Sequence, residues 1–401
     1  MALKLNPSVA ASLDAGFEKT FGTAPERYFS APGRTEIGGN HTDHQRGRVL
    51  AAAVNLDTVA AVKATGTNTI RIQSEGYPLC IVELDDLTPV EAEINTTAAL
   101  IRGVAARFVQ LGCPVGGFDA YVTSSVLPGS GLSSSAAYEV LIGTIINHLF
   151  FGGKVSQPEV AMIGQYAENV FFGKPCGLMD QTASAVGGMV TIDFFDKEHP
   201  AIEKVEFDFA SCGHALCIID SRASHADLTD EYAAITIELK NICSFFGKEV
   251  LTQIPEKDFI ANMATLREQF GDRAVLRAYH FYKENARVPQ QVAALRSGDF
   301  DTFLRLVKES GYSSYMYLQN VIPAGYTEHQ DVAVSLALCE LYLGGRGAYR
   351  VHGGGFAGTV QAFVPYDILD AFRSGIDAVL GAGACHVLSI RPEGGVEAFT
   401  A

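Results

Sequence analysis

The chain has 401 residues, which exceeds a typical domain of roughly 100–200 residues and predicts two domains. Hydrophobic residues make up 48% and charged residues 19%, a balance that supports sizeable hydrophobic cores and excludes disordered and fibrous classes. The net charge is −15 and no run of five like charges occurs, which argues against nucleic acid as a main partner. An anionic substrate would need a locally positive site.

The sequence contains no recognisable targeting or membrane-spanning segment. The N-terminal segment carries acidic residues, and no later stretch reaches the roughly 18 uncharged apolar residues of a membrane span. We therefore expect a soluble, cytoplasmic protein with no membrane partner. The eight cysteines form no CxxC pair and mostly lie in apolar surroundings, which favours reduced core thiols over disulfides or a zinc site.

Strands and helices alternate along the first half of the chain. Hydrophobic periodicity predicts strands on both sides of a turn at 64–68, a helix over 97–111 and a strand over 118–126. A further strand over 187–193 gives way to the polar, proline-containing stretch 195–204. We place the boundary between two domains there, dividing the chain into 1–205 and 206–401.

The second half also mixes both kinds of element. We predict a strand over 216–220, a helix over 230–246, a long helical region to about 310 and a strand over 360–364. No internal repeat or low-complexity segment occurs. The pattern predicts a second α+β domain.

A glycine- and serine-rich loop at 127–136, LPGSGLSSSA, lies between the predicted strand 118–126 and an apolar helical pattern. Backbone amides at a helix start suit a phosphate group, and glycines let them approach it closely. Ordinary capping of the helix by a serine is the alternative interpretation. The loop is not a P-loop, because the sequence GxxxxGK[ST] is missing.

A second glycine-rich segment, VHGGGFAGTV at 351–360, precedes the predicted strand 360–364. Four of the six positions from Gly353 to Gly358 are glycine, which costs backbone entropy and needs a structural reason. One interpretation is a bulged hairpin or a close approach of a helix. The other is a loop that packs against a ligand or against the loop 127–136.

Two more segments concentrate polar residues beside apolar strands or helices. In 31–45, Arg34, Glu36, His41, Asp43 and His44 crowd a glycine-interrupted stretch, which indicates a site. A metal site is disfavoured there, because the adjacent Asp43 and His44 would point apart in a strand. In 167–181, a predicted helix ends at 173 and is followed by a stretch in which Asp180 is the single acidic residue among uncharged ones. Asp180 either caps a following helix or has a functional role.

Taken in order, the segments APGR…HTDH, LPGSGLSSSA, AEN…CGLMDQ and HGGGFAG resemble the GHMP kinase superfamily and, most closely, its galactokinase branch. Weaker similarity at 220–232 and 282–288 extends the resemblance over nearly the whole chain. It implies an α+β fold with a ribosomal-S5-like N-terminal domain, a ferredoxin-like C-terminal domain and an active site in the cleft between them. It also implies ATP, Mg²⁺ and phosphoryl transfer to the anomeric C1 hydroxyl of a sugar.

The resemblance assigns roles residue by residue. The residues expected around the ATP phosphates are Pro128, Gly129, Ser130, Gly131, Leu132, Ser133, Ser134, Ser135 and Ala136, with Gly354 and Gly355 also expected at the cofactor. Ser135, or alternatively Ser134, and Glu168 are the expected Mg²⁺ ligands, since this cation prefers oxygen. The expected sugar contacts are Arg34, Asn40, His41, Asp43, Gly177, Asp180 and Tyr232.

Asp180 and Arg34 match the catalytic pair of the family. Asp180 would accept or orient the proton of the C1 hydroxyl, while Arg34 keeps it ionised and stabilises the transferring charge. Alternatively, Asp180 mainly positions the hydroxyl, because proton removal comes late in a loose transition state.

The chain departs from the family pattern at several positions. The family has Glu where this chain has Asn40, and the resemblance implies that this position contacts the C6 end of the sugar. The family also has Tyr where this chain has His44, and Thr where it has His352. The arginines expected after Tyr232 are missing. Losing a carboxylate at position 40 removes a charge that would repel a C6 carboxylate. Galactose is the expected substrate, with galacturonate or another hexose as alternatives.

A different class of function is a catalytically silent regulator that binds sugar and ATP. The intact serine run and the presence of both Arg34 and Asp180 argue against it. The sequence leaves the oligomeric state open, with a monomer or a weak dimer both compatible.

Overall fold

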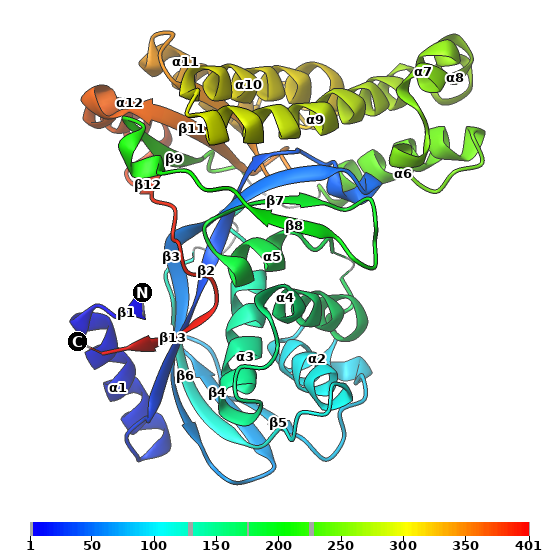
Figure 1. The fold of residues 1–401 in the computed structure, drawn as a ribbon. Helices are drawn as coiled ribbons and strands as arrows, with labels where there is room; N and C mark the ends of the chain where they lie inside the picture. Colours follow the sequence, from blue (N-terminus) through cyan, green and yellow to red (C-terminus); the bar gives the residue numbers. More distant parts are fainter. Residues whose placement is uncertain (1–2, 127–130, 175, 224–227, 401) are drawn as a thin grey trace.

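The computed structural model describes residues 3–126, 131–174, 176–223 and 228–400, which form two β-sheets with helices packed on them (Figure 1). No helix among these residues is long and apolar enough to cross a membrane. All eight cysteines are unpaired, and most are buried, which agrees with the expected reduced thiols.

The first sheet has nine strands in the described residues, and its main path runs β1-β13-β2-β3-β6-β4-β5, with β7 paired to β3 and β8 paired to β7. The strands are β1 (Leu3–Lys4), β2 (Arg27–Gly38), β3 (Arg48–Ala64), β4 (Thr69–Ser74), β5 (Cys80–Glu83), β6 (Phe118–Ser124), β7 (Met189–Asp193), β8 (Ala201–Lys204) and β13 (Val396–Phe399). The strands predicted around 64–68, at 118–126 and at 187–193 are thus confirmed.

Both faces of the first sheet are covered by helices (Figure 1). The covering helices are α1 (Pro7–Phe21), α2 (Thr97–Gln110), α3 (Ser134–Phe150), α4 (Gln157–Tyr166) and α5 (Met179–Val186). Because side chains alternate along a strand, Ala60 and Val62 of β3 join the core under α2–α5, whereas Val59 and Ala61 pack with α1.

The second sheet has the order β10-β11-β9-β12 and is antiparallel throughout. Its strands are β9 (His214–Asp220), β10 (Ala348–His352), β11 (Thr359–Pro365) and β12 (Cys385–Leu388). The helices of this half are α6 (Thr229–Phe245), α7 (Glu256–Ala261), α8 (Met263–Phe270), α9 (Asp272–Ser297), α10 (Phe300–Ser313), α11 (Asp331–Leu343) and α12 (Leu369–Leu380). The predicted strands 216–220 and 360–364 and the predicted helices are present.

One hydrophobic core joins the two sheets. Leu50 and Val54 of β3 pack in the same cluster as Ile218 of β9, Phe303 of α10 and Phe363 of β11. Helix α9, in the second half of the chain, also contacts β2 and β3 and is therefore anchored directly on strands of the first sheet. The junction between the sheets is therefore held by apolar packing rather than by a flexible linker.

The C-terminus returns to the first sheet. β13 pairs with β2, and β1 pairs with β13, so both chain ends lie at the same edge (Figure 1). β8 ends at Lys204, directly before the predicted boundary at 205. The division into 1–205 and 206–401 stays a prediction, and the pairing of β13 shows that the last residues belong to the first sheet.

Gly187 is held against the C-terminal segment. It ends α5 with a φ of +73°, and a Cβ there would lie 2.2 Å from the backbone nitrogen of Gly394. Gly271 has a similar backbone conformation, with φ +86° and ψ 166° against φ +73° and ψ 170° at Gly187, but a Cβ there would meet nothing within 4 Å. The two glycines therefore separate backbone strain from steric overlap.

We expect Gly271→Ala to lower the free energy of unfolding by about 1–3 kcal/mol, because alanine is strained in this backbone conformation. Gly187→Ala should lower it by roughly a further 1–3 kcal/mol, because the new methyl group overlaps backbone atoms. Urea unfolding followed by circular dichroism measures both variants. Equal losses would contradict the packing of α5 against residue 394.

Candidate active site

Arg34 of β2 and Asp180 of α5 form a bidentate ion pair. The guanidinium Nε lies 2.7 Å from Oδ1 of Asp180, and Nη2 lies 2.9 Å from Oδ2. The Arg34 side chain is only 8% exposed, so much of this pair is shielded from water. Two residues that are 146 positions apart in the chain thus meet in one site.

The loop that precedes α3 is tied to the same pair. The backbone N–H of Arg34 donates to the carbonyl of Leu132 at 3.0 Å, and Nη1 of Arg34 donates to the carbonyl of Gly131. The Ser133 hydroxyl donates to Oδ2 of Asp180. Strand β2, helix α5 and the start of α3 therefore converge on one carboxylate. Pro128, Gly129 and Ser130 lie outside the described residues.

The start of α3 is not an ordinary capped helix. Ser133 occupies the cap position in a left-handed conformation with a φ of +56°, and its side chain makes no capping hydrogen bond. The capping interpretation is therefore wrong. Backbone amides in the first turn, at Ser134, Ser135 and Ala136, have no side-chain cap, an arrangement that suits an anion.

The pKa of Asp180 is set by opposing effects. Burial acts to raise it, but the charge and hydrogen bonds of Arg34, together with the hydrogen bond from Ser133, lower it below the usual range. The carboxylate is consequently ionised at neutral pH. It does not cap α5, because Leu178 holds the cap position and Asp180 lies inside the first turn.

A cavity of about 410 Å³ opens beside this ion pair. Its lining contains six of the seven predicted sugar contacts, namely Arg34, His41, Asp43, Gly177, Asp180 and Tyr232. It is also lined by Glu36, His44, Lys174, Cys176, Met179, Thr236, Gly353 and Gly354. A space of this size with convergent polar groups fits one small polar ligand.

Close backbone approaches shape the cavity walls. A Cβ at Gly177 would lie 2.5 Å from Oδ2 of Asp43, so glycine leaves room for that carboxylate. A Cβ at Gly354 would lie 2.7 Å from the Tyr232 ring. The Tyr232 hydroxyl donates to the carbonyl of Gly355 at 2.9 Å.

Gly354 and Gly355, which were expected near the cofactor, therefore contact residues of the cavity. The segment 353–358 connects the antiparallel strands β10 and β11, so it is also a hairpin connection. Its flanks touch the loop before α3, since a Cβ at Gly131 would lie 3.0 Å from Thr359 Oγ1 and 3.2 Å from His352 Nδ1. Contact between the two glycine-rich segments, one of the interpretations above, is present.

His41 presents a neutral imidazole to the cavity. Loss of hydration and the neighbouring His44 lower its pKa to about 4, despite the hydrogen bond to Gly354. Nε2 lies 3.1 Å from the carbonyl oxygen of Gly354 and therefore carries the hydrogen. The sequence analysis treated Asp43 and His44 as part of a strand. In the structure they lie in a 3-10 turn (Asp43–Gln45).

Asn40 lies behind the cavity and not in its lining. It is fully buried, and its Nδ2 donates to Oε1 of Glu36 at 3.1 Å and to the carbonyl of Gly353 at 2.7 Å. Its Oδ1 accepts from Ser314 at 3.1 Å and from Asn320 at 3.0 Å. Because an amide has two donors and two acceptor positions, this side chain has no capacity left for a ligand.

Two buried carboxylates, Glu139 and Glu168, are held by Gln181, the residue after Asp180. Gln181 Nε2 donates to Oε2 of Glu168 at 3.0 Å and to Oε2 of Glu139 at 2.9 Å. Burial and the charge of Glu168 raise the pKa of Glu139 well above its usual range. Oε1 of Glu139 is buried and has no hydrogen-bond partner among the described residues.

This oxygen-rich cluster fits the expected Mg²⁺. Glu168 is 3% exposed and lies in a π-helical turn (Ala167–Phe172) that follows α4, and its Oε1 is 3.6 Å from Lys174 Nζ. No group of three or more His, Cys, Asp or Glu side chains suited to a metal occurs among the described residues. A few protein oxygens are enough for Mg²⁺, which binds through one or two carboxylates together with phosphates and water.

Sequence reasoning placed Glu36 in the polar stretch 31–45 but gave it no role, and it missed Glu139, Gln181 and Lys174. Glu36 is two residues after Arg34, so strand alternation predicts that it shares a face with that residue. Glu139 is four residues after Ser135, one helical turn further along α3. Both signals were present in the sequence.

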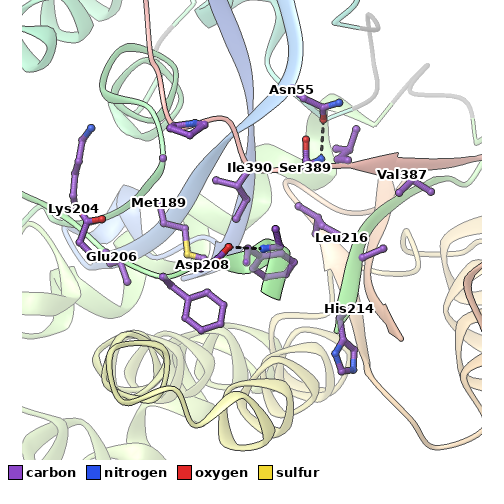
Figure 2. A pocket seen from close by; sticks show the side chains of 18 of the residues that line it. Asn55, Met189, Lys204, Glu206, Asp208, His214, Leu216, Val387, Ser389 and Ile390 are labelled. Atoms are coloured by element: carbon purple, nitrogen blue, oxygen red, sulfur yellow. Dashed lines mark hydrogen bonds between the residues drawn. The ribbon is translucent and has the colours of Figure 1, made fainter. Parts of the chain in front are cut away.

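A larger cavity of about 690 Å³ lies between the two sheets (Figure 2). Met189, Leu216, Val387 and Ile390 contribute to its walls, and Figure 2 shows Lys204 and Glu206 at one side. It contains none of the predicted site residues. The smaller cavity is the candidate site, because it combines a partly buried ion pair with several convergent polar groups.

Comparisons with known proteins identify the family of this chain. Residues 15–64 match the galactokinase galactose-binding signature, and residues 99–188 match the GHMP kinases N terminal domain. The galactokinase of Glaesserella parasuis is 32% identical over 366 residues, covering 89% of this chain and 90% of that protein. The galactokinase of Streptomyces coelicolor is 31% identical over 396 residues, covering 98% and 99%.

Solved structures confirm the expected GHMP kinase fold. The galactokinase of Lactococcus lactis complexed with galactose has a TM-score of 0.82 at 24% identity, and the match covers 97% of this chain and 99% of that one. A mevalonate kinase has a TM-score of 0.64 at 13% identity, with coverage of 92% and 100%. The chain belongs to the galactokinase family within the GHMP kinase superfamily.

Proposed function

We propose that this protein is a galactokinase that transfers the γ-phosphoryl group of ATP to the C1 hydroxyl of galactose. The observation that carries the proposal is the Arg34–Asp180 pair, which lies in the wall of the 410 Å³ cavity and contacts the loop before α3. A sugar in the cavity and a triphosphate on the loop would meet at this pair.

Asp180 is suited to orient the reacting hydroxyl. Its lowered pKa makes it a weak base but an ionised hydrogen-bond acceptor. We infer that it accepts a hydrogen bond from the C1 hydroxyl and takes the proton late, when the phosphoryl group has moved far toward the sugar. Arg34 holds the carboxylate with two hydrogen bonds and supplies positive charge beside the transferring group.

The cofactor assignments remain part of the proposal. The loop 128–136 would hold the ATP phosphates, and Glu168 with Ser135, or alternatively Ser134, would hold Mg²⁺. When bound, this cation neutralises phosphate charge. A cytoplasmic location is supported by the eight unpaired cysteines, since disulfides are rare in that compartment.

The charges in the cavity favour a neutral sugar. Three carboxylates, Glu36, Asp43 and Asp180, line the cavity against two cations. Arg34 is paired with Asp180, and Lys174 lies 3.6 Å from Glu168, while His41 is neutral. A sugar that carries its own carboxylate would meet net negative charge here. Galactose is therefore favoured over galacturonate, although position 40 is an amide.

The direct test of function measures ADP release with Mg-ATP and a panel of hexoses and uronic acids. We expect kcat/KM for galactose to exceed that for galacturonate by at least about tenfold, because of the charge repulsion. The phosphorylated position, assigned by NMR, should be C1. Sugar binding without turnover would identify a silent regulator, and a preference for galacturonate would contradict the proposed substrate.

Removing either member of the ion pair should stop most of the turnover. We expect Asp180→Ala and Arg34→Ala each to lower kcat at least about a hundredfold, the scale of a lost acid–base or electrostatic element. The matched control is Arg346→Ala, which breaks an exposed bidentate pair with Asp367 and should leave kcat unchanged. Near-normal kcat in a folded Asp180 or Arg34 variant would remove that residue from the reaction.

Filling the space at Gly177 should weaken sugar binding selectively. We expect Gly177→Ala to raise KM for galactose about tenfold or more, because the methyl group displaces Asp43. KM for ATP serves as the internal control and should stay within about twofold. An equal rise of both constants would indicate general disruption.

A further inference from the structure

Glu36 is an acidic residue of the cavity that has no assigned role. It lies two positions after Arg34 on β2, and both side chains line the cavity. Residues two apart on a strand point to the same face and are separated by roughly 7 Å. Glu36 therefore faces the cavity at some distance from the Arg34–Asp180 pair.

The protein fixes one oxygen of this carboxylate and leaves the other free. Oε1 accepts from Arg350 Nη2 at 2.5 Å and from Asn40 Nδ2 at 3.1 Å. Oε2 has no hydrogen-bond partner in the described part of the chain. Burial raises the pKa of Glu36, opposed by Arg350 and Arg34, so the ionised form depends on these two arginines.

The supports of Glu36 are themselves immobilised. Arg350 is fully buried and also donates to the carbonyls of Ile37 and Val351 at 3.0 and 2.9 Å. His352 Nε2 lies 3.2 Å from the backbone nitrogen of Glu36, which fixes the strand at this residue. An acceptor that is held this firmly is preorganised for a donor in the cavity.

Asn40 cannot form a hydrogen bond with a sugar in the cavity. Its amide already makes four hydrogen bonds, with Glu36, Gly353, Ser314 and Asn320. The family resemblance implies a contact with the C6 end of the sugar at position 40. In this chain another residue must make that contact. Glu36 accepts a hydrogen bond from Asn40 and reaches the cavity wall.

We propose, on the basis of the proposed function, that Glu36 is a specificity residue whose Oε2 accepts a hydrogen bond from a sugar hydroxyl remote from C1, on C4 or C6. With C1 at Asp180, the opposite edge of a pyranose ring extends along β2 toward Glu36. A carboxylate oxygen only accepts hydrogen bonds, so it selects a hydroxyl over a hydrogen atom at that edge.

The test compares galactose with 4-deoxygalactose and 6-deoxygalactose in the wild type and in Glu36→Gln. Arg350 and Asn40 both need an acceptor, so a glutamine would turn its oxygen toward them and present its NH₂ group to the sugar. We expect the wild type to prefer galactose over at least one analogue by about tenfold or more. Glu36→Gln should reduce that preference by about tenfold, mainly through KM, with kcat changing less.

The control variant is Glu93→Gln, because Glu93 accepts two hydrogen bonds from Arg102 in a partly buried pair away from the cavity. It should leave every preference unchanged. If Glu36→Gln does not fold, Glu36→Asp keeps the charge for Arg350 but withdraws the carboxylate, and should lower the same preference.

The proposal is overturned if the wild type uses galactose and both deoxy sugars equally well. It is also overturned if the Glu36 variants lower all three activities in parallel, which indicates a purely structural role. A wild type that does not phosphorylate galactose overturns the proposed function itself, and this inference with it.

Discussion

The site depends on a shielded charge pair that connects three separate parts of the chain. Asp180 accepts two hydrogen bonds from Arg34 and one from Ser133, and Arg34 also holds the backbone at 131–132. A buried charge without its partner is strongly unfavourable, so each of these groups restricts the others. Strand β2, helix α5 and the start of α3 thus keep one relative geometry.

The sequence predicted the elements whose periodicity is strong. The helix expected over 97–111 is α2 (Thr97–Gln110), and the strand expected over 118–126 is β6 (Phe118–Ser124). The concentration of polar residues in 31–45 and the single acid at 180 both pointed to residues that line the 410 Å³ cavity. Both signals arise because chemistry requires polar groups where packing alone would place apolar ones.

The rest depended on long-range contacts. Glu36 and Asn40 are both polar and four residues apart, and only the folded backbone shows that one lines the cavity while the other lies behind it. The link from Gln181 to Glu139 and Glu168 joins three helical segments. Capping of α3 by a serine was a reasonable expectation, but tertiary contacts turn Ser133 toward Asp180. No local pattern encodes such choices.

The position of β13 has a consequence for synthesis. The strand between β1 and β2 is formed by residues 396–399, which are made long after the other strands of this sheet. Domains generally fold as units while the nascent chain emerges, N-terminal ones first. In this protein the first sheet stays incomplete at one edge until residues 396–399 have been made, so a chain cut short before them would lack part of a sheet whose other strands were made much earlier.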